Sequence, residues 1–146
     1  MKFDHVGIVV ASMAAGRDHL SALFGIGRWS EEFADTGIGV NVQFGRDPSG
    51  ICYEIVAPLR EDSPVTRALN ARDRILNHVA YLVPDLEAEA ARVREIRCMP
   101  AGPAMPAVAY GGRRVQFFVS PLYFIIELIE APGHAHRYLD APTAAS

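Results

Sequence analysis

The chain has 146 residues, of which half are hydrophobic and 21% are charged, and its formal net charge is −3. This balance is typical of one globular domain, or of two half-domains that share a core, and it excludes an intrinsically disordered chain. Dense runs of Lys or Arg are absent, so we expect neither nucleic acid nor a membrane as a partner. We also expect no signal peptide or membrane span, and two unpatterned cysteines favour a cytoplasmic location.

The first part of the chain predicts a strand, a helix and three further strands. Residues 3–10 are rich in β-branched side chains, which favour a strand. Ser12 is a typical helix N-cap residue, and residues 13–24 predict a helix that ends at Gly25. Three shorter runs predict the remaining strands, over residues 28–33, 39–46 and 51–57.

A second set of the same elements follows a short connection. Ser63-Pro64 is a favourable helix start, so a short helix is expected over residues 64–70. Asp85 is then the expected cap of a helix over residues 86–97. The expected strands of this part cover residues 76–83, 113–119 and 123–130, with a Pro-rich loop over residues 100–106.

The elements recur because the sequence itself repeats at an offset of 73 residues. The matching landmarks are His5 with His78, Ser12 with Asp85, Val42-Gln43-Phe44 with Val115-Gln116-Phe117, and Glu54 with Glu127. The repeat predicts one βαβββ module over residues 1–58 and a second over residues 75–131. A linker helix region, residues 59–74, would join them, and residues 132–146, rich in Pro, Ala and His, would form a loosely ordered tail.

Each module carries one His and one Glu within predicted strands. Glu127 has two aliphatic residues on either side, and an unpaired carboxylate buried there would cost several kcal/mol. A cation shared by the two modules removes this cost. We therefore predict that His5, Glu54, His78 and Glu127 bind one divalent metal ion. Mixed imidazole and carboxylate ligands suit Co, Ni, Zn, Mn or Fe, and the types alone do not select among them. The alternative is a degenerate site that has lost its metal.

Five short motifs carry a resemblance to a known family. They are Asp4-His5-Val6-Gly7-Ile8, Tyr53-Glu54-Ile55-Val56-Ala57-Pro58-Leu59, Asp62-Ser63-Pro64, Asn77-His78-Val79-Ala80 and Ile126-Glu127-Leu128. Together they resemble the vicinal oxygen chelate superfamily, which includes glyoxalase I, methylmalonyl-CoA epimerase, extradiol dioxygenases and bleomycin-resistance proteins. The resemblance implies an α+β fold in which two tandem βαβββ modules with curled mixed sheets form a metal-binding cleft. It also places the family's ligand positions on the four residues above and implies a homodimer.

Within the family, the chain is most similar to methylmalonyl-CoA epimerases. The similar features are the Glu-x-x-x-Pro-Leu strand end, the Asp-Ser-Pro that follows and the Gly-Gly-Arg-Arg run over residues 111–114. This resemblance implies an acyl-CoA substrate and proton exchange at the carbon α to its thioester, with a metal-stabilised enolate. One departure is clear. The acidic base of the epimerases would fall within residues 39–44, which contain no acid.

Two alternatives remain open at this stage. In a glyoxalase I-type lyase acting on a glutathione adduct, a metal-bound Glu is itself the base, so Glu54 and Glu127 are the catalytic candidates. A non-catalytic small-molecule-binding protein of the drug-resistance type is the other alternative, although such proteins usually lack the four ligands. Candidate substrate-binding residues are polar or cationic and lie near the predicted strands: Asn41, Gln43, Arg113 and Arg114. His134 and His136, in the predicted tail, are expected to be free.

Overall fold

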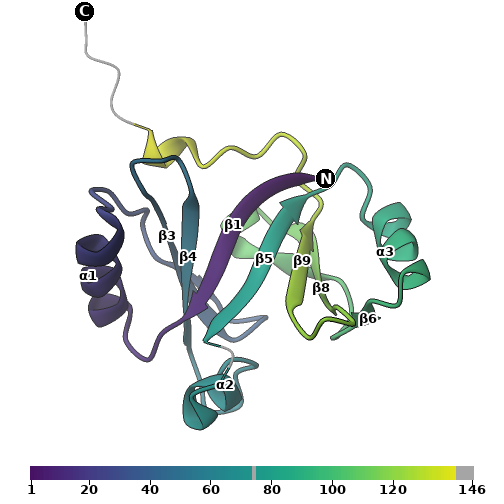
Figure 1. Ribbon diagram of the computed structural model, residues 1–146, viewed down its shortest axis with the longest axis horizontal. Helices are drawn as coiled ribbons and strands as arrows, with labels where there is room; N and C mark the ends of the chain where they lie inside the picture. The colour runs from purple at the N-terminus through teal and green to yellow at the C-terminus, as the bar shows by residue number, and fades with distance from the viewer. Residues whose placement is uncertain (74, 141–146) are drawn as a thin grey trace, which may run out of the picture.

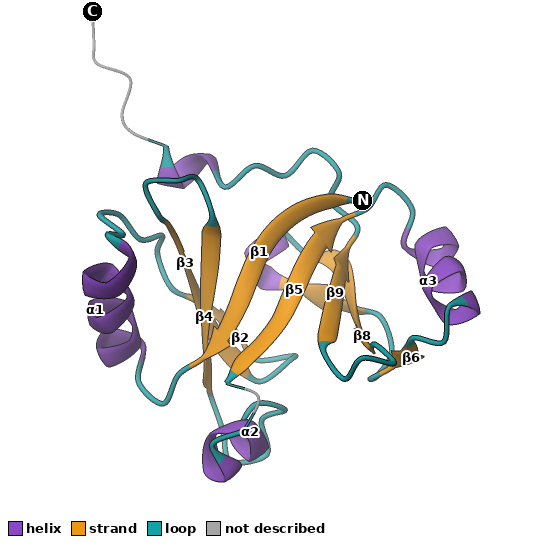
Figure 2. Cartoon of the chain, in the orientation of Figure 1, coloured by secondary structure: helices purple, strands orange, loops and turns teal. Residues whose placement is uncertain are grey.

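The computed structural model describes residues 1–73 and 75–140 (Figure 1). Its centre is one mixed sheet with the strand order β2-β3-β4-β1-β5-β9-β8-β6, and β7 pairs with β8. Two helices, α1 and α3, lie at opposite ends of the sheet, and the short helix α2 lies below it (Figure 2). The sheet is strongly curled, so its inner face encloses a core and a cavity. The α+β class and the curled mixed sheet agree with the prediction.

The first half contains β1 (Lys2–Val9), α1 (Met13–Phe24), β2 (Phe33–Asp35), β3 (Val40–Arg46) and β4 (Cys52–Pro58). Helix α1 has the predicted bounds. Its first turn is capped by the Ser12 hydroxyl, which accepts from Ala15 N at 3.3 Å, and Gly25 ends it in the left-handed conformation at φ 70°. The strand predicted over residues 28–33 is misplaced: Trp29 forms only an isolated bridge to Gly45, and β2 begins at Phe33, the last residue of that range.

The linker helix α2 covers Thr66–Ala71, so it begins two residues and ends one residue later than predicted. The expected side-chain cap from Ser63 does not form. Its hydroxyl oxygen is buried without a hydrogen-bond partner, and it is the Ser63 backbone carbonyl that accepts from Thr66 N, at 3.1 Å. The start of α2 is therefore held by this backbone bond and by the Thr66 hydroxyl, which donates to the carbonyl oxygen of Arg60 at 3.3 Å.

The second half contains β5 (Leu76–Leu82), α3 (Leu86–Glu95), β6 (Met99–Pro100), β7 (Met105–Ala107), a 3-10 turn (Val108–Tyr110), β8 (Arg113–Val119) and β9 (Ile125–Ile129). Asp85 caps α3 as predicted, accepting from Ala88 N at 3.0 Å. The stretch expected to be a loop is partly β-structure, since β6 and β7 both pair with β8.

Both halves have the same strand pairing, as the repeat requires. β1 is parallel to β4, β5 is parallel to β9, and each of β4 and β9 is antiparallel to the strand before it. The halves join where β1 and β5 pair antiparallel, with Val6 opposite Val79. In the middle of the sheet the strands are arranged in the order β4-β1-β5-β9. The four strands that carry the predicted ligands, two from each half, are therefore neighbours.

The segment after β9 differs from the loosely ordered tail that we expected. Residues 132–140, here called the C-terminal segment, run from the end of β9 towards β3 and finish in a 3-10 turn, Arg137–Leu139 (Figure 1). Leu139 is buried in the core, and Arg46 forms a 2.7 Å ion pair with Asp140. The rest of the predicted tail, residues 141–146, lies outside the described residues.

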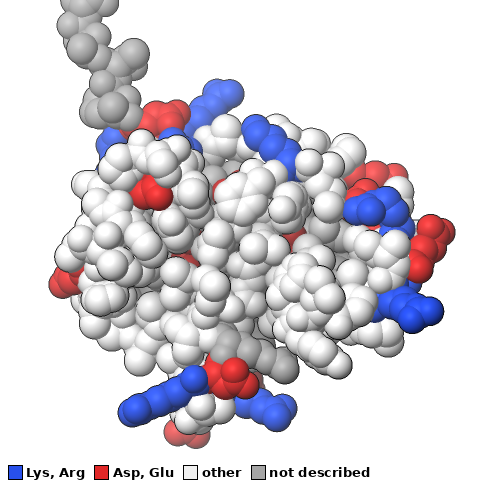
Figure 3. All heavy atoms as spheres, in the orientation of Figure 1, with Lys and Arg blue, Asp and Glu red and all other residues white. Residues whose placement is uncertain are grey.

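The outer surface carries charges of both signs. On the face shown in Figure 3, Lys and Arg lie beside Asp and Glu around the edge, and the middle is mostly uncharged. Among the described residues, no helix is long and apolar enough to cross a lipid bilayer.

Candidate metal centre

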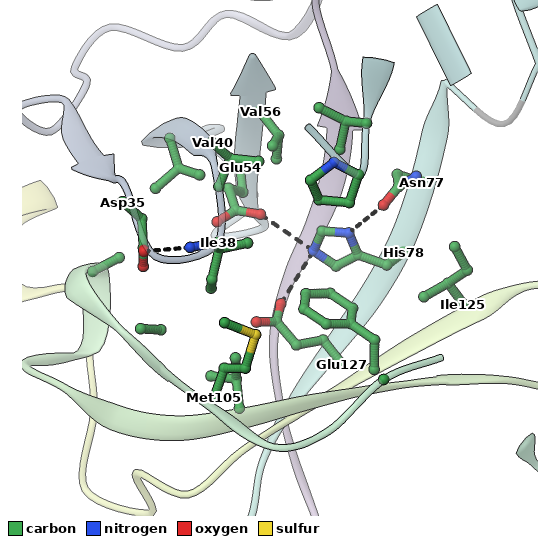
Figure 4. Close-up of a pocket in the computed structure, with 18 of the residues that line it drawn as sticks. Asp35, Ile38, Val40, Glu54, Val56, Asn77, His78, Met105, Ile125 and Glu127 are labelled. Atoms are coloured by element: carbon green, nitrogen blue, oxygen red, sulfur yellow. Dashed lines mark hydrogen bonds and ion pairs between the residues drawn. The ribbon is translucent and has the colours of Figure 1, made fainter. Parts of the chain in front are cut away.

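Four adjacent strands direct one side chain each towards a common point. β1 provides His5, β4 provides Glu54, β5 provides His78 and β9 provides Glu127. The side chains are between 0% and 8% exposed. Figure 4 shows the carboxylates of Glu54 and Glu127 reaching the same nitrogen of His78, Nε2, one from above and one from below. The predicted ligand set is therefore brought together by the fold.

The separations between the donor atoms match those around a single metal ion. His5 Nε2 lies 3.0 Å from His78 Nε2 and 3.3 Å from Oε2 of both Glu54 and Glu127. His78 Nε2 lies 3.2 Å from the same two oxygens. Metal–ligand bonds of about 2.0–2.2 Å place neighbouring donors roughly 3.0–3.4 Å apart, depending on the coordination geometry.

The hydrogen bonds of the two imidazoles leave their inner nitrogens free to bind a cation. His5 Nδ1 lies 2.8 Å from Asp4 Oδ2, and His78 Nδ1 lies 3.0 Å from Asn77 Oδ1. An oxygen acceptor at Nδ1 places the proton there, so in the neutral ring Nε2 presents its lone pair to the centre. Glu127 Oε2 is buried and receives no hydrogen bond. Four electron-pair donors facing one another fit a divalent cation.

Without a metal, the charges of the centre are balanced by protons on the imidazoles. Burial alone would lower the pKa of His5, but the carboxylates of Glu54, Asp4 and Glu127 raise it well above its usual value. Burial likewise opposes the charged form of His78, and the neighbouring carboxylates of Glu127 and Glu54 raise its pKa. Burial would raise the pKa of Glu54, and the two neighbouring imidazoles lower it to about 2. Metal binding therefore has to displace protons from histidine.

A glycine provides the space that one ligand needs. Gly7 lies directly across the β1–β5 pair from His78. A Cβ atom at Gly7 would lie 2.0 Å from Cε1 of the His78 ring and 2.4 Å from both ring nitrogens. The imidazole thus occupies the volume of the missing side chain, and any larger residue at position 7 would displace it.

The centre opens into a mostly apolar cavity of about 450 Å³, within the usual range for small-molecule sites. Glu54, His78 and Glu127 form part of its wall. Most of the remaining wall is aliphatic or aromatic, from Ile38, Val40, Val42, Val56, Met105, Val115, Phe117 and Ile125 (Figure 4). None of the described residues that line it is Lys or Arg.

Comparison with known proteins agrees with this geometry. A family model described as the Glyoxalase/Bleomycin resistance protein/Dioxygenase superfamily matches residues 4–117. The chain belongs to this superfamily. It is 28% identical over 141 residues to the uncharacterized protein YqjC of Bacillus subtilis (strain 168), an alignment that covers 93% of this chain and 96% of the relative.

Two solved structures are similar over nearly the whole chain. The methylmalonyl-CoA epimerase of Mycobacterium tuberculosis is 25% identical and superposes with a TM-score of 0.73. The alignment covers 88% of this chain and 86% of the epimerase. The hypothetical protein BH1468 of Bacillus halodurans C-125 is 22% identical, with a TM-score of 0.77 over 92% of this chain and 97% of that protein. Both structures share the fold of this chain over nearly its whole length.

The predicted substrate-binding residues lie away from the cavity beside the metal centre. Asn41 donates to Glu32 at 2.8 Å, and Gln43 donates to the carbonyl oxygen of Ser30 at 2.7 Å. Both side chains point to the opposite face of β3 from Val40 and Val42, which line the cavity. The structure gives neither residue a place beside the cavity.

The two arginines are placed similarly. Arg114 pairs with Glu130 at 3.0 Å and with Glu87 at 2.8 Å on the outer surface, and Arg113 is exposed. On β8 it is Val115 and Phe117 that reach the cavity instead. The expectation that these two arginines bind substrate therefore has no support from their positions.

Sequence reasoning missed three residues behind the metal centre: Asp4, Tyr110 and His136. Strand alternation placed Asp4 on the face opposite His5, but a β-bulge between Phe3 and His5 turns both side chains inward. His136, which we expected to be free, is only 3% exposed. The bulge gave no signal in the sequence, whereas a third His next to a repeat with two ligand histidines was a signal that could have been followed.

Proposed function

We propose that this protein is a metal-dependent enzyme that removes a proton from a carbon α to a carbonyl or thioester group. The observation that carries the proposal is the buried set of two imidazoles and two carboxylates, which opens into an apolar cavity. A divalent ion held by His5, Glu54, His78 and Glu127 would supply Lewis-acid stabilisation of the enolate oxygen. Its identity among Co, Ni, Zn, Mn and Fe is a matter for measurement.

The choice of catalytic base follows from the acids in the cavity wall. Among the described residues, the acids that line it are Asp35, Glu54 and Glu127. Asp35 accepts hydrogen bonds from the backbone nitrogens of Ile38 and Val108, at 3.0 and 2.9 Å, so both of its carboxylate oxygens already have a donor. Glu127 has an oxygen without a hydrogen-bond donor. We therefore propose Glu127 as the base.

Glu54 is the natural partner of Glu127 in an epimerisation. That reaction removes a proton from one face of the α-carbon and returns one to the other face, so it needs acids on two sides. Glu54 and Glu127 come from β4 and β9, which flank the two histidine strands, and their carboxylates reach His78 Nε2 from above and from below in Figure 4. This arrangement supports an epimerase over a reaction that uses one face only.

The similarity to the Mycobacterium tuberculosis epimerase supports the same reaction class, and an acyl-CoA thioester is accordingly our proposed substrate. The strand β3 provides no acid on the cavity side, since its cavity-facing residues include Val40 and Val42. A base from that strand, as the resemblance to epimerases implies, is therefore missing in this chain. The two metal-centre carboxylates have to perform the proton transfer.

A glyoxalase I-type lyase is the second candidate. The observation that favours it is the same lack of an acid on β3, because such an enzyme uses a metal-bound Glu as its base. A non-catalytic binding protein of the drug-resistance type is disfavoured by the complete set of four ligand residues. We further propose a homodimer, which light scattering during gel filtration would detect as twice the mass of the 15.9 kDa chain.

Proton exchange tests the proposal. The protein is reconstituted with Co(II), methylmalonyl-CoA is added in heavy water, and loss of the α-proton signal is followed by NMR. We expect fast exchange that requires metal and is lost in Glu127→Gln, which removes both the proposed base and one of the four metal ligands. Absence of exchange in a metal-loaded protein, together with turnover of the hemithioacetal of glutathione and methylglyoxal, would replace the epimerase with the lyase.

A further inference from the structure

We propose that His136, in the C-terminal segment, is a positioning residue of the metal centre, and that it acts through Asp4 on the ligand His5. The inference rests on the proposed metal site, and it concerns how firmly that site is built. Neither repeat contains the C-terminal segment, so this chain would complete its pseudo-symmetric centre with a part that the symmetry does not provide.

The contacts converge on one carboxylate oxygen. Asp4 Oδ2 lies 2.8 Å from His5 Nδ1, 2.9 Å from His136 Nε2 and 2.5 Å from the Tyr110 hydroxyl. His5 is completely buried, and Asp4, Tyr110 and His136 are between 3% and 7% exposed. An ionised carboxylate at this depth needs several donors, and these three groups supply them.

Asp4 in turn fixes the orientation of His5. A ligand His whose second nitrogen donates to a carboxylate is held in one tautomer and one ring plane, and it is a stronger electron donor to the metal. His136 is the donor to Asp4 that comes from the far end of the chain, 132 residues away. Without it, the buried carboxylate lacks one donor and can turn away from the His5 ring.

The C-terminal segment holds His136 firmly enough for this role. The His136 ring packs on Phe44 with centroids 4.6 Å apart, and its Nδ1 contacts the Tyr138 hydroxyl. Leu139 is buried nearby, and Asp140 is tied to Arg46 and Arg28 on the other half of the molecule. The segment is thus anchored at His136 itself and at the residues that follow it, Leu139 and Asp140.

The support of the two ligand histidines is unequal. At the repeat offset, Asp4 corresponds to Asn77, whose side-chain oxygen lies 3.0 Å from Nδ1 of His78. His5 is therefore backed by a carboxylate and His78 by an amide. Since only the carboxylate carries a full charge, His5 is the ligand whose strength depends most on its outer partner, and the C-terminal segment contacts that partner.

Three variants test the role of His136. His136→Leu removes the donor, His136→Gln retains an N–H that can reach Asp4, and Leu139→Ala loosens the same segment without changing a polar contact. Metal affinity is measured by competition with a chelator, and the visible spectrum of bound Co(II) reports the ligand field. We expect His136→Leu to weaken metal binding roughly 10–100-fold and to shift the Co(II) spectrum. His136→Gln should recover most of the affinity, and Leu139→Ala should lower thermal stability while its spectrum stays that of the parent.

The inference is overturned if His136→Leu binds metal as tightly as the parent with the same spectrum. It is also overturned if all three variants lose affinity in proportion to lost stability, since the segment would then only support the fold. A parent chain that binds no ion overturns it together with the metal site. If the parent binds metal but catalyses no proton exchange, only the proposed function is contradicted, and the proposed role of His136 is unaffected.

Discussion

Replacing Gly7 by Ala should remove His78 from the metal centre. The added Cβ would lie 2.0 Å from Cε1 of the imidazole, whereas carbon atoms in contact are normally about 3.5–4.0 Å apart. The ring therefore has to retreat by roughly 1.5 Å or more. Metal–ligand bonds tolerate deviations of only about 0.2 Å, so a shift of this size breaks the bond from His78 Nε2.

The expected loss of metal affinity in Gly7→Ala can be estimated by dividing the free energy of metal binding among the four ligands. Structural zinc sites bind with an apparent free energy of about 10–16 kcal/mol, or roughly 3 kcal/mol per ligand, and losing one ligand weakens binding roughly a hundredfold. Overpacking the β1–β5 pair should also reduce the free energy of unfolding of the metal-free protein by about 1–3 kcal/mol. For a chain of this length, each kcal/mol corresponds to a melting-temperature loss of about 2–4 °C.

Calorimetric titration with Co(II) measures the affinity, and thermal melts of the metal-free protein measure the stability. Gly27→Ala is the matched control, because a Cβ at Gly27 has no atom within 4 Å and should change neither quantity. If Gly7→Ala binds Co(II) as tightly as the parent, then His78 is either not a ligand or not held where the structure has it, and our reasoning about Gly7 fails.

Three further predictions concern protonation, the ligand set and a helix cap. The raised pKa values of His5 and His78 keep both imidazoles protonated to higher pH, so metal affinity should rise with pH, and titrations in buffers of different ionisation enthalpy should show proton release. For the same reason, the stability that these two groups give the metal-free protein is present below about pH 6.5 and is lost as pH rises through their raised pKa values, as melts from pH 5 to 9 should show. His78→Ala should abolish metal binding and activity together, and retained metal with full activity would contradict the ligand assignment. Asp85→Ala should reduce the free energy of unfolding by about 1 kcal/mol in chemical denaturation without affecting metal binding, because only the cap to Ala88 is lost.

Two kinds of residue could be predicted from the sequence: those whose contacts are with near neighbours in the chain, and those that recur in both halves of the repeat. The helix caps Ser12 and Asp85 form as expected because a cap depends on a few neighbouring residues. The four members of the metal centre were found because the offset of 73 residues placed one His and one Glu on equivalent strands of each half. A carboxylate such as Glu127 within an aliphatic strand then required a partner of opposite charge.

Residues whose orientation depends on pairing between distant segments could not be predicted. A single bulge in β1 reverses the face of Asp4, because side chains alternate along a strand. The same alternation turns Asn41 and Gln43 away from the cavity, which composition alone does not reveal. His136 reaches Asp4 across 132 residues, and although a third His in the tail was a signal, its local sequence does not say which residue it contacts.

The central claim is that the two halves share one metal ion through four side chains. Its most direct test is a titration of the metal-free protein with Co(II), followed by visible absorption and by the metal content after gel filtration, with Glu127→Gln and Asn41→Ala measured alongside. We predict one ion per chain for the parent and for Asn41→Ala, and a large loss of affinity in Glu127→Gln. No bound ion in the parent, or equal binding in Glu127→Gln, would contradict the shared centre.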